Sequence, residues 1–229
     1  MTKSKETVVI LCGGKGLRLR PITNDIPKPL IEIDDKPILE HIINQFLSFD
    51  FEKFIIATGY KSKKIEDFMK KKFKDVDYTI INSGDVNILE RIRHCISKIQ
   101  TNCILCYGDT LTDLNINKLR ETHKKNKNVM LVSSYPIRIP FGVMDINSSN
   151  IVTKFEEKPL LTQVMNIGFF YVPKIMFDVF SKYKKFEILL GNLAKQKKLK
   201  SFKHTGVHIT VNTVAELEDA QENAKKLYK

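Results

Sequence analysis

A glycine-rich loop follows the first apolar segment of the chain. Residues 7–12 (TVVILC) form a short β-branched run, and three glycines come soon after it: Gly13, Gly14 and Gly16. Glycines let the backbone turn sharply and present N–H groups to an anion. Leu19 stands where a G-x-G-x-x-G dinucleotide motif needs its third glycine, and prolines follow where that motif needs a long helix. The loop also lacks the Lys-Ser or Lys-Thr pair of a Walker A motif. We therefore expect the loop to bind an anion through its backbone N–H groups, but as neither a dinucleotide-binding motif nor a Walker A motif.

The same loop carries cations that could hold phosphate groups. Arg18 and Lys28 follow the glycines, and Lys28 lies between Pro27 and Pro29, whose fixed φ angles restrict the backbone around it. Two like unit charges 4 Å apart cost about 4 kcal/mol at an effective dielectric constant near 20. A site that brings a triphosphate against a second phosphate must therefore supply several cations, and Arg18 and Lys28 are the candidates.

Two side chains that carry oxygen are candidates for binding a metal ion. Asp109 follows the apolar segment CILCY and Gly108, and Asn212 stands immediately before Thr213, where a helix is expected to begin. Open α/β sheets bind ligands at the carboxyl ends of their strands, and Mg²⁺ prefers hard oxygen ligands that it shares with phosphates. These positions predict a Mg²⁺ site at that edge. Asp113 is the competing carboxylate, although its position favours a helix cap.

Strand and helix patterns alternate through the first half of the chain. The apolar runs predict strands at 7–12, 54–58, 78–81 and 103–107. Helical spacing predicts a helix at 37–49, one that Ser62 caps at its N-terminus, and one over residues 88–99 for which Asp85 is the candidate N-cap. This β-α order predicts a parallel, doubly wound sheet with helices on both faces.

The second half has a different pattern. We expect strands at 129–134, 151–156 and 166–172, and a last helix near Thr213, where Thr213 and Glu216 form a capping box. These strands predict a smaller mixed-sheet lobe packed on the first half. The predicted fold class is α/β: a Rossmann-like three-layer α/β/α architecture with a mostly parallel central sheet and a smaller mixed-sheet lobe. Because no linker separates the halves, residues 1–229 are expected to form a single domain.

Composition excludes several classes of protein. The 229 residues are 42% hydrophobic and 28% charged, close to globular averages, which excludes disordered, collagen-like and coiled-coil chains. The apolar runs are too short for a transmembrane helix or a signal peptide, so we expect a cytoplasmic protein without a membrane partner. The net charge of +12 comes almost entirely from lysine, without an arginine-rich stripe, a zinc finger or an RNA-binding motif. Nucleic acid is therefore not an expected partner.

The four cysteines all stand in apolar stretches: Cys12, Cys95, Cys103 and Cys106. Cys103 and Cys106 have the C-x-x-C spacing of redox and zinc pairs. Residues three apart on a strand point to opposite faces, so this pair is predicted to fill the core on two sides of the sheet.

The sequence resembles the sugar-1-phosphate nucleotidyltransferases over essentially its whole length. The family pattern G-G-x-G-(S/T)-R-(L/M)-x-P-x-T…P-K-P-(L/M)…K-P-(I/L)-L-x-H matches residues 13–30 and 36–41. Further matches are YGD (107–109), FGV (141–143), FEEKP (155–159) and MNIGFF (165–170), and the segments YGDTLTDLNINKL and KSFKHTG look most like glucose-1-phosphate cytidylyltransferases. Three features depart from the pattern: Leu17 replaces Ser or Thr, residues 87–91 replace a small-residue segment beside the base, and Asn212 stands where many members have Asp.

The resemblance implies a Mg²⁺-dependent transfer of a nucleotidyl group from an NTP, with CTP favoured, to a sugar 1-phosphate for glycan biosynthesis. It places nucleotide binding in residues 1–127 and sugar binding in residues 128–229, approximately. The implied catalytic residues are Arg18 and Lys28, and the implied metal ligands are Asp109 and Asn212. The implied nucleotide-binding residues are Leu11, Gly13, Gly14, Gly16, Gly84 and Asp85, and the implied sugar-binding residues are Gly142, Glu157, Lys158 and Asn166. Members of the family commonly form homo-oligomers. Because base and sugar are selected by the shape of the pocket, the sequence names neither.

Three other functions fit part of the pattern. A cytidylyltransferase for a non-sugar phosphate such as phosphocholine would share the first loop, although E-E-K-P and Asn-x-Gly favour a sugar. A non-catalytic nucleotide-binding relic of the fold would account for Leu17, residues 87–91 and Asn212. Nucleic-acid binding rests on charge alone and predicts a steep dependence of affinity on salt.

Overall fold

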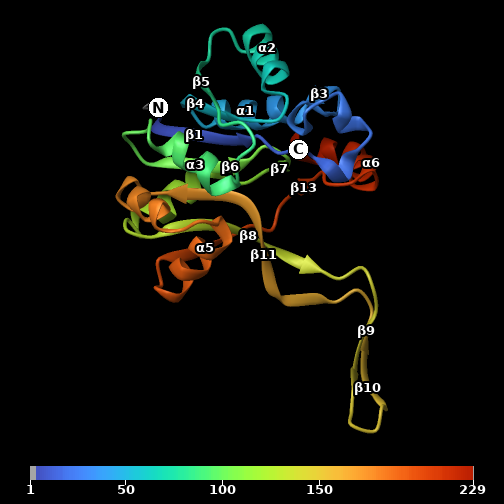
Figure 1. Ribbon diagram of the computed structural model, residues 1–229. Helices are drawn as coiled ribbons and strands as arrows, with labels where there is room; N and C mark the ends of the chain where they lie inside the picture. The colour runs from blue at the N-terminus through green and yellow to red at the C-terminus, as the bar shows by residue number, and fades with distance from the viewer. Residues whose placement is uncertain (1–3, 229) are drawn as a thin grey trace.

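A seven-stranded sheet forms the centre of the molecule (Figure 1). The computed structural model describes residues 4–228, and the strand order of this sheet is β12-β8-β11-β6-β1-β4-β5. The strands are β1 (Ser4–Cys12), β4 (Phe51–Thr58), β5 (Asp77–Asn82), β6 (Cys103–Tyr107), β8 (Met130–Arg138), β11 (Leu160–Val172) and β12 (Leu199–Lys203). β11 runs antiparallel to β6 and β8, and the other neighbouring pairs are parallel. The predicted mostly parallel sheet is confirmed.

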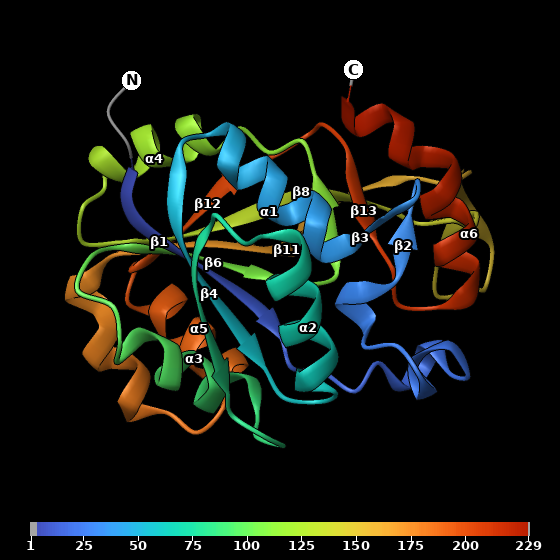
Figure 2. The same ribbon diagram turned by 90° about the horizontal axis from the view of Figure 1, so that it is seen from above.

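Helices cover both faces of this sheet (Figure 2). On one face lie α1 (Ile38–Ser48), α2 (Ser62–Lys72), α4 (Ile116–Lys124) and α6 (Val214–Asn223). The other face carries α3 (Ile88–Ile96), the 3₁₀ segment η4 (Lys174–Lys182) and α5 (Phe186–Lys195). Side chains alternate along a strand, so Val8 and Ile10 of β1 pack into the first layer and Val9 into the second. The three-layer architecture therefore follows from strands that are apolar on both faces.

The strands of the second half are arranged differently from the expectation. β8, β11 and β12 extend the central sheet instead of forming a separate packed lobe. The antiparallel pair β9 (Val143–Ile146) and β10 (Val152–Glu156) lies at the end of an arm, residues 139–164, that projects from the body (Figure 1). A strand pattern gives no register and no partner, and β11 joins β6 across about sixty residues of intervening chain, so the sequence could not show this pairing.

Several short strands and 3₁₀ segments lie outside the central sheet. The small antiparallel pairs join β2 (Glu32–Ile33) to β3 (Lys36–Pro37) and β7 (Thr110–Thr112) to β13 (His208–Thr210). The remaining 3₁₀ segments are η1 (Leu17–Leu19), η2 (Ile22–Asn24), η3 (Lys28–Leu30) and η5 (Ala224–Tyr228). No helix within residues 4–228 is both long and apolar enough to span a membrane.

Two of the expected N-caps in the first half are wrong. Ser62 is the first residue of α2, where Lys61 is the N-cap, and the Ser62 hydroxyl donates to Glu66 Oε1 at 2.8 Å. Asp85 does not cap α3: the Asn87 side chain accepts a hydrogen bond from the backbone N–H of Glu90 at 3.1 Å. Asn87 is two residues closer to the apolar pattern, and its cap leaves the Asp85 carboxylate available to other partners.

Two further caps were expected from the sequence, at Asp113 and Thr213. Asp113 is not a helix cap, because Asn115 caps α4 and Asp113 Oδ1 accepts from the Val207 N–H at 2.6 Å. The cap at Thr213 is confirmed: its hydroxyl accepts from the Glu216 N–H at 3.2 Å. The Glu216 carboxylate accepts from the Asn212 N–H at 2.5 Å rather than from the cap residue, so this helix start also holds Asn212.

The cysteines are core residues, as predicted. All four are buried and free, and Cys103 and Cys106 pack into opposite layers. Burial is the main cause that raises the pKa of each thiol above its ordinary value. We expect a thiol reagent such as dithionitrobenzoate to leave the native protein unmodified at pH 8 and to modify all four thiols once the chain is unfolded. Rapid modification of the native protein would contradict the burial.

Candidate active site

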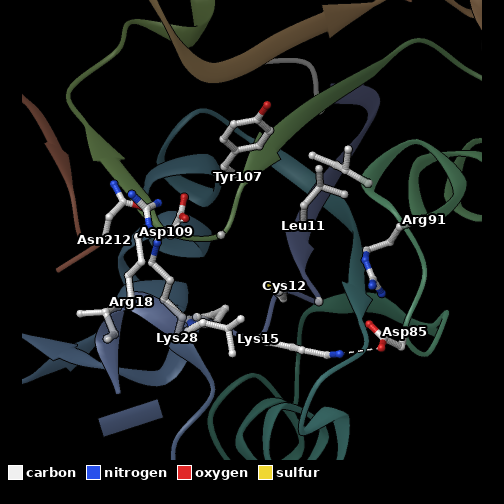
Figure 3. A pocket seen from close by; sticks show the side chains of 18 of the residues that line it. Leu11, Cys12, Lys15, Arg18, Lys28, Asp85, Arg91, Tyr107, Asp109 and Asn212 are labelled. Atoms are coloured by element: carbon white, nitrogen blue, oxygen red, sulfur yellow. Dashed lines mark hydrogen bonds and ion pairs between the residues drawn. The ribbon is translucent and has the colours of Figure 1, made fainter. Parts of the chain in front are cut away.

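A cavity of about 660 Å³ opens at the carboxyl ends of β1 and β6 (Figure 3). Ligands bind along this edge in open α/β sheets, so the place agrees with the sequence expectation. The residues that line it are Leu11, Cys12, Gly13, Gly14, Lys15, Gly16, Leu17, Arg18, Leu19, Lys28, Pro29, Asp85, Val86, Ile88, Arg91, Tyr107, Gly108, Asp109 and Asn212. The cavity therefore gathers the glycine loop, the segment after β5, the end of β6 and the residue before α6.

No long helix leaves the glycine loop, as its prolines predict, and the chain after Gly16 folds into short 3₁₀ turns. Gly16 has φ +62°, a conformation that favours glycine, and its carbonyl accepts from the Leu19 N–H and the Thr23 hydroxyl, each at 2.9 Å. A Cβ on Gly16 would lie 2.9 Å from Thr23 Cγ2 and 3.5 Å from Lys28 Cβ. The turns η1 to η3 thus return the chain toward the loop and bring Lys28 beside it.

Four side chains from three distant segments meet at one end of the cavity. Lys28 Nζ donates to Asp109 Oδ2 at 2.5 Å and to Asn212 Oδ1 at 3.0 Å. Arg18 Nη2 donates to the same Asn212 Oδ1 at 3.0 Å. The Lys28 side chain is only 12% exposed, so its charge lies in a partly desolvated place where the carboxylate balances it. The structure therefore brings together the two predicted catalytic cations and both predicted metal ligands.

Local contacts fix Asp109 in this cluster. The Gly108 N–H donates to the Leu11 carbonyl at 3.0 Å, and a Cβ on Gly108 would lie 2.7 Å from that oxygen. Glycine is therefore required where the chain leaves β6. The Thr110 hydroxyl donates to Asp109 Oδ1 at 3.2 Å, which leaves Oδ2 for Lys28.

Asn212 is oriented by its neighbours on both sides. Its side-chain Nδ2 donates to the Thr210 hydroxyl at 3.2 Å, and its backbone N–H donates to Glu216 Oε2. With the amide nitrogen held by Thr210, the amide oxygen points at Lys28 and Arg18. Thr210 was not a sequence candidate, although its place at the end of β13, two residues before Asn212, is a signal that could have found it.

The oxygen pair suits a hard cation. Asp109 Oδ2 and Asn212 Oδ1 converge on one point, which the Lys28 ammonium occupies at 2.5 and 3.0 Å. Within the described residues, no group of three or more His, Cys, Asp or Glu side chains could hold a metal ion. Mg²⁺ is commonly held by one or two protein oxygens together with substrate phosphates, so a carboxylate and an amide oxygen fit it.

Other side chains shape the far end of the cavity. Lys15 Nζ and Asp85 Oδ2 form an ion pair at 2.6 Å between the glycine loop and the segment after β5 (Figure 3). Gly84 has φ +66° and does not line the cavity, whereas Leu11 and Asp85 do. The buried Arg91 lies in this wall too, and sequence reasoning missed it. Its signal was an arginine on the apolar stripe of a helix, three residues after Ile88 and four before Cys95.

The four predicted sugar-binding residues are divided between two places. Asn166 lies beside Tyr107: burial raises the pKa of Tyr107, a hydrogen bond with Asn166 lowers it, and the Asp109 charge raises it. Gly142, Glu157 and Lys158 lie on the exposed arm and do not line the cavity. Gly142 and Glu157 are neighbours there, since a Cβ on Gly142 would lie 3.0 Å from Glu157 Oε2. The structure places Asn166 beside Tyr107, which lines the cavity, and leaves the other three residues away from it.

A polar group continues from the cluster along β13. His208 and Thr210 share one face of that strand, and burial, with help from the His204 charge, lowers the pKa of His208 to about 4, although Asp109 opposes the change. The ring of Tyr135 lies 5.0 Å from that of His208. A neutral His208 at physiological pH therefore adds no charge to the cation cluster.

Comparison with known proteins identifies the family of this chain. The model of the nucleotidyl transferase family matches residues 7–205. The chain belongs to that family. A Bacillus subtilis protein named "Probable glucose-1-phosphate cytidylyltransferase" is 32% identical, over 91% of this chain and 92% of the relative. The D-glycero-alpha-D-manno-heptose 1-phosphate guanylyltransferase of Campylobacter jejuni is 29% identical, over 82% of this chain and 87% of the relative. The predicted membership of the sugar-1-phosphate nucleotidyltransferases is confirmed.

A solved structure supports the fold of this nucleotidyltransferase as well. HddC from Yersinia pseudotuberculosis superposes with a TM-score of 0.74 at 25% identity, covering 96% of this chain and 99% of that one. The α/β fold class predicted for this nucleotidyltransferase is thus confirmed by its own topology and by a known structure.

Proposed function

We propose that this nucleotidyltransferase moves a nucleotidyl group from an NTP to a sugar 1-phosphate and releases pyrophosphate. One observation carries the proposal. Arg18, Lys28, Asp109 and Asn212 converge at one end of a cavity whose other end is built from the glycine loop and the segment after β5. This arrangement can neutralise several phosphate groups at one point, which joining a triphosphate to a second phosphate requires.

The reaction needs no protein nucleophile. The acceptor phosphate oxygen attacks the α-phosphorus in line, the bond from that phosphorus to the β-phosphate bridge breaks, and pyrophosphate leaves. Catalysis then consists of positioning and of charge stabilisation. We assign Arg18 to the departing pyrophosphate and Lys28 to the acceptor phosphate or the α-phosphoryl group. Asp109 and Asn212 would hold Mg²⁺, which when bound neutralises charge on the phosphoryl oxygens.

The nucleotide and the sugar are assigned to different parts of the chain. We assign the nucleotide to Leu11, Gly13, Gly14, Gly16 and the segment at Gly84 and Asp85, within residues 1–127. Asn166, beside Tyr107, would orient the sugar. Gly142, Glu157 and Lys158 would take part when the arm of residues 139–164 approaches an acceptor. Likeness to the Bacillus subtilis protein favours CTP as donor, and the Campylobacter jejuni protein makes GTP the first alternative. We further propose a role in surface-polysaccharide or related glycan biosynthesis, as the sequence motifs imply.

Thermal unfolding with single nucleotides tests the donor. CTP, UTP, dTTP, GTP and ATP are each added with MgCl₂ to the purified protein. A ligand at a hundred times its dissociation constant adds about 2.7 kcal/mol to the free energy of unfolding. For a chain of this size we expect Tm to rise by about 5–10 °C with one triphosphate. Inorganic phosphate is the control for binding through phosphate alone.

The acceptor is then tested by pyrophosphate release. With the selected triphosphate, a panel of sugar 1-phosphates is compared with phosphocholine, and we expect release with a sugar 1-phosphate only. Release with phosphocholine alone would replace the sugar by a non-sugar acceptor. A clear Tm shift without release for any acceptor would indicate the non-catalytic relic instead.

A further inference from the structure

A buried arginine joins three segments at the nucleotide end of the cavity. Arg91 is only 5% exposed. Its Nη1 donates to the Thr58 carbonyl, and its Nη2 donates to the carbonyls of Gly84 at 3.0 Å and Val86 at 3.3 Å. Thr58 ends β4, and Gly84 and Val86 belong to the segment that follows β5. One guanidinium group therefore connects the end of β4 to the segment that follows β5.

Glycines make room for this guanidinium group. A Cβ on Gly13 would lie 2.1 Å from Arg91 Cζ, and a Cβ on Gly59 would lie 2.7 Å from Arg91 Nη1. Gly13 lies in the cavity wall immediately after β1. The guanidinium group thus packs directly against the glycine loop while it binds the segment on the other side. The glycine loop and the segment after β5, which form the two walls of the nucleotide end, therefore both contact Arg91.

The charge of Arg91 is matched to backbone oxygens. Burial lowers its pKa from the ordinary value, while Cys95, Cys12 and Asp85 nearby raise it, and the guanidinium group stays charged at physiological pH. Three carbonyl dipoles point at it and replace the water that burial removed. Since arginine offers five donors in a rigid plane, one side chain can satisfy all three carbonyls at once.

We propose that Arg91 is a positioning residue for the donor nucleotide: it fixes the Gly84–Val86 segment against the glycine loop so that the pocket for the base is built before the NTP binds. The inference rests on the proposed function. It gives a role to the segment 87–91, where the family has small residues. Here the apolar Ile88 lines the cavity, and the third residue after it reaches back to hold the wall. Asp85, on that segment, is placed by the same contacts.

A second arginine on the same helix provides a matched control. Arg93 Nε donates to the Phe180 carbonyl at 2.8 Å, and its Nη2 donates to the carbonyls of Ser181 and Tyr183. It too binds three carbonyls from one place on α3, but it holds η4 and the residue after it, and neither Arg93 nor those residues line the cavity. Loss of either arginine removes three hydrogen bonds to backbone carbonyls, so we expect both losses to destabilise the fold. Only the loss of Arg91 changes the nucleotide end.

The experiment compares Arg91→Met, Arg91→Lys and Arg93→Met with the unchanged protein. Calorimetry with each NTP and MgCl₂ gives the dissociation constant, and steady-state kinetics gives KM for the NTP and for the sugar 1-phosphate. Arg91→Met is expected to weaken NTP binding and raise its KM by about tenfold or more, because the wall segment is no longer held before binding. The acceptor KM is expected to stay within about twofold, since that end is built from other segments.

The two further variants separate positioning from stability. Arg91→Lys is expected to lie between Met and Arg in NTP affinity, because an ammonium group can reach some of the carbonyls but lacks the planar fork. Arg93→Met is expected to lower Tm while leaving the NTP dissociation constant within about twofold.

Three results would overturn the inference. The first is an unchanged NTP dissociation constant in folded Arg91→Met. The second is an equal loss of NTP affinity in Arg93→Met. The third concerns the case in which Arg91→Met does not fold. In that case, an Arg91→Lys variant that binds NTP as tightly as the unchanged protein would overturn the inference. Failure of the unchanged protein to bind any NTP would instead overturn the proposed function, so the two failures are distinguishable.

Discussion

Lys28→Ala is expected to lower the turnover number by at least about 100- to 1,000-fold, the range for removing one preorganised charge or donor from a reaction centre. Lys28 Nζ donates to both Asp109 Oδ2 and Asn212 Oδ1, at 2.5 and 3.0 Å. Its removal takes away the positive charge that would steady the acceptor phosphate or the α-phosphoryl group. The glycine loop and its hydrogen bonds at Gly16 do not depend on Lys28 Nζ, so the fold is expected to persist.

Pyrophosphate release under saturating substrates measures this effect, with circular dichroism as the check on folding. Arg20→Ala is the matched control, because Arg20 belongs to the same loop, is exposed and does not line the cavity. Its turnover is expected to stay within about twofold of the unchanged protein. Near-normal turnover of Lys28→Ala would remove Lys28 from the mechanism, and an equal loss in Arg20→Ala would point to the charge of the whole loop instead.

The parts of the fold that could be predicted are those with a local cause. The apolar runs at 7–12 and 103–107 have no polar face, so they had to be strands buried on both sides, and they are β1 and β6. Prolines after Gly16 exclude a long helix, and three 3₁₀ turns are found there. The strand-end rule then placed Asp109 at the ligand edge, and the cavity lies there.

The parts that could not be predicted depend on pairing between distant segments. β11 pairs antiparallel with both β6 and β8. Through this pairing, the strands predicted at 129–134 and 166–172 belong to the central sheet. Their sequence is equally compatible with a separate lobe, because register and partner are tertiary properties. The same holds for Arg91: α3 shows its apolar stripe, but only the approach of Thr58 and Gly84 explains an arginine within it. Asn87 displaced Asp85 as N-cap because both residue types cap helices and a pattern locates a cap only approximately.

Asp109→Asn is expected to reduce turnover by about 100-fold or more at millimolar MgCl₂, because the amide keeps the shape of the carboxylate and loses its charge. A neutral amide binds Mg²⁺ more weakly than a carboxylate, so part of the activity is expected to return as the MgCl₂ concentration is raised. Turnover measured against MgCl₂ concentration checks this. Asp113→Asn is the control: Asp113 accepts from the Val207 N–H, does not line the cavity, and is expected to leave the MgCl₂ dependence unchanged.

The double variant Lys28→Ala with Asp109→Asn shows whether the two side chains act as one unit. They contact each other at 2.5 Å, and residues in contact show non-additive effects. If Lys28 and Asp109 serve the same phosphoryl group, the double variant is expected to turn over about as slowly as the slower single variant. Its fold-loss in turnover would then be far smaller than the product of the two single fold-losses. Losses that multiply would mean that Lys28 and Asp109 contribute independently to turnover, and would contradict the idea that they act as one unit.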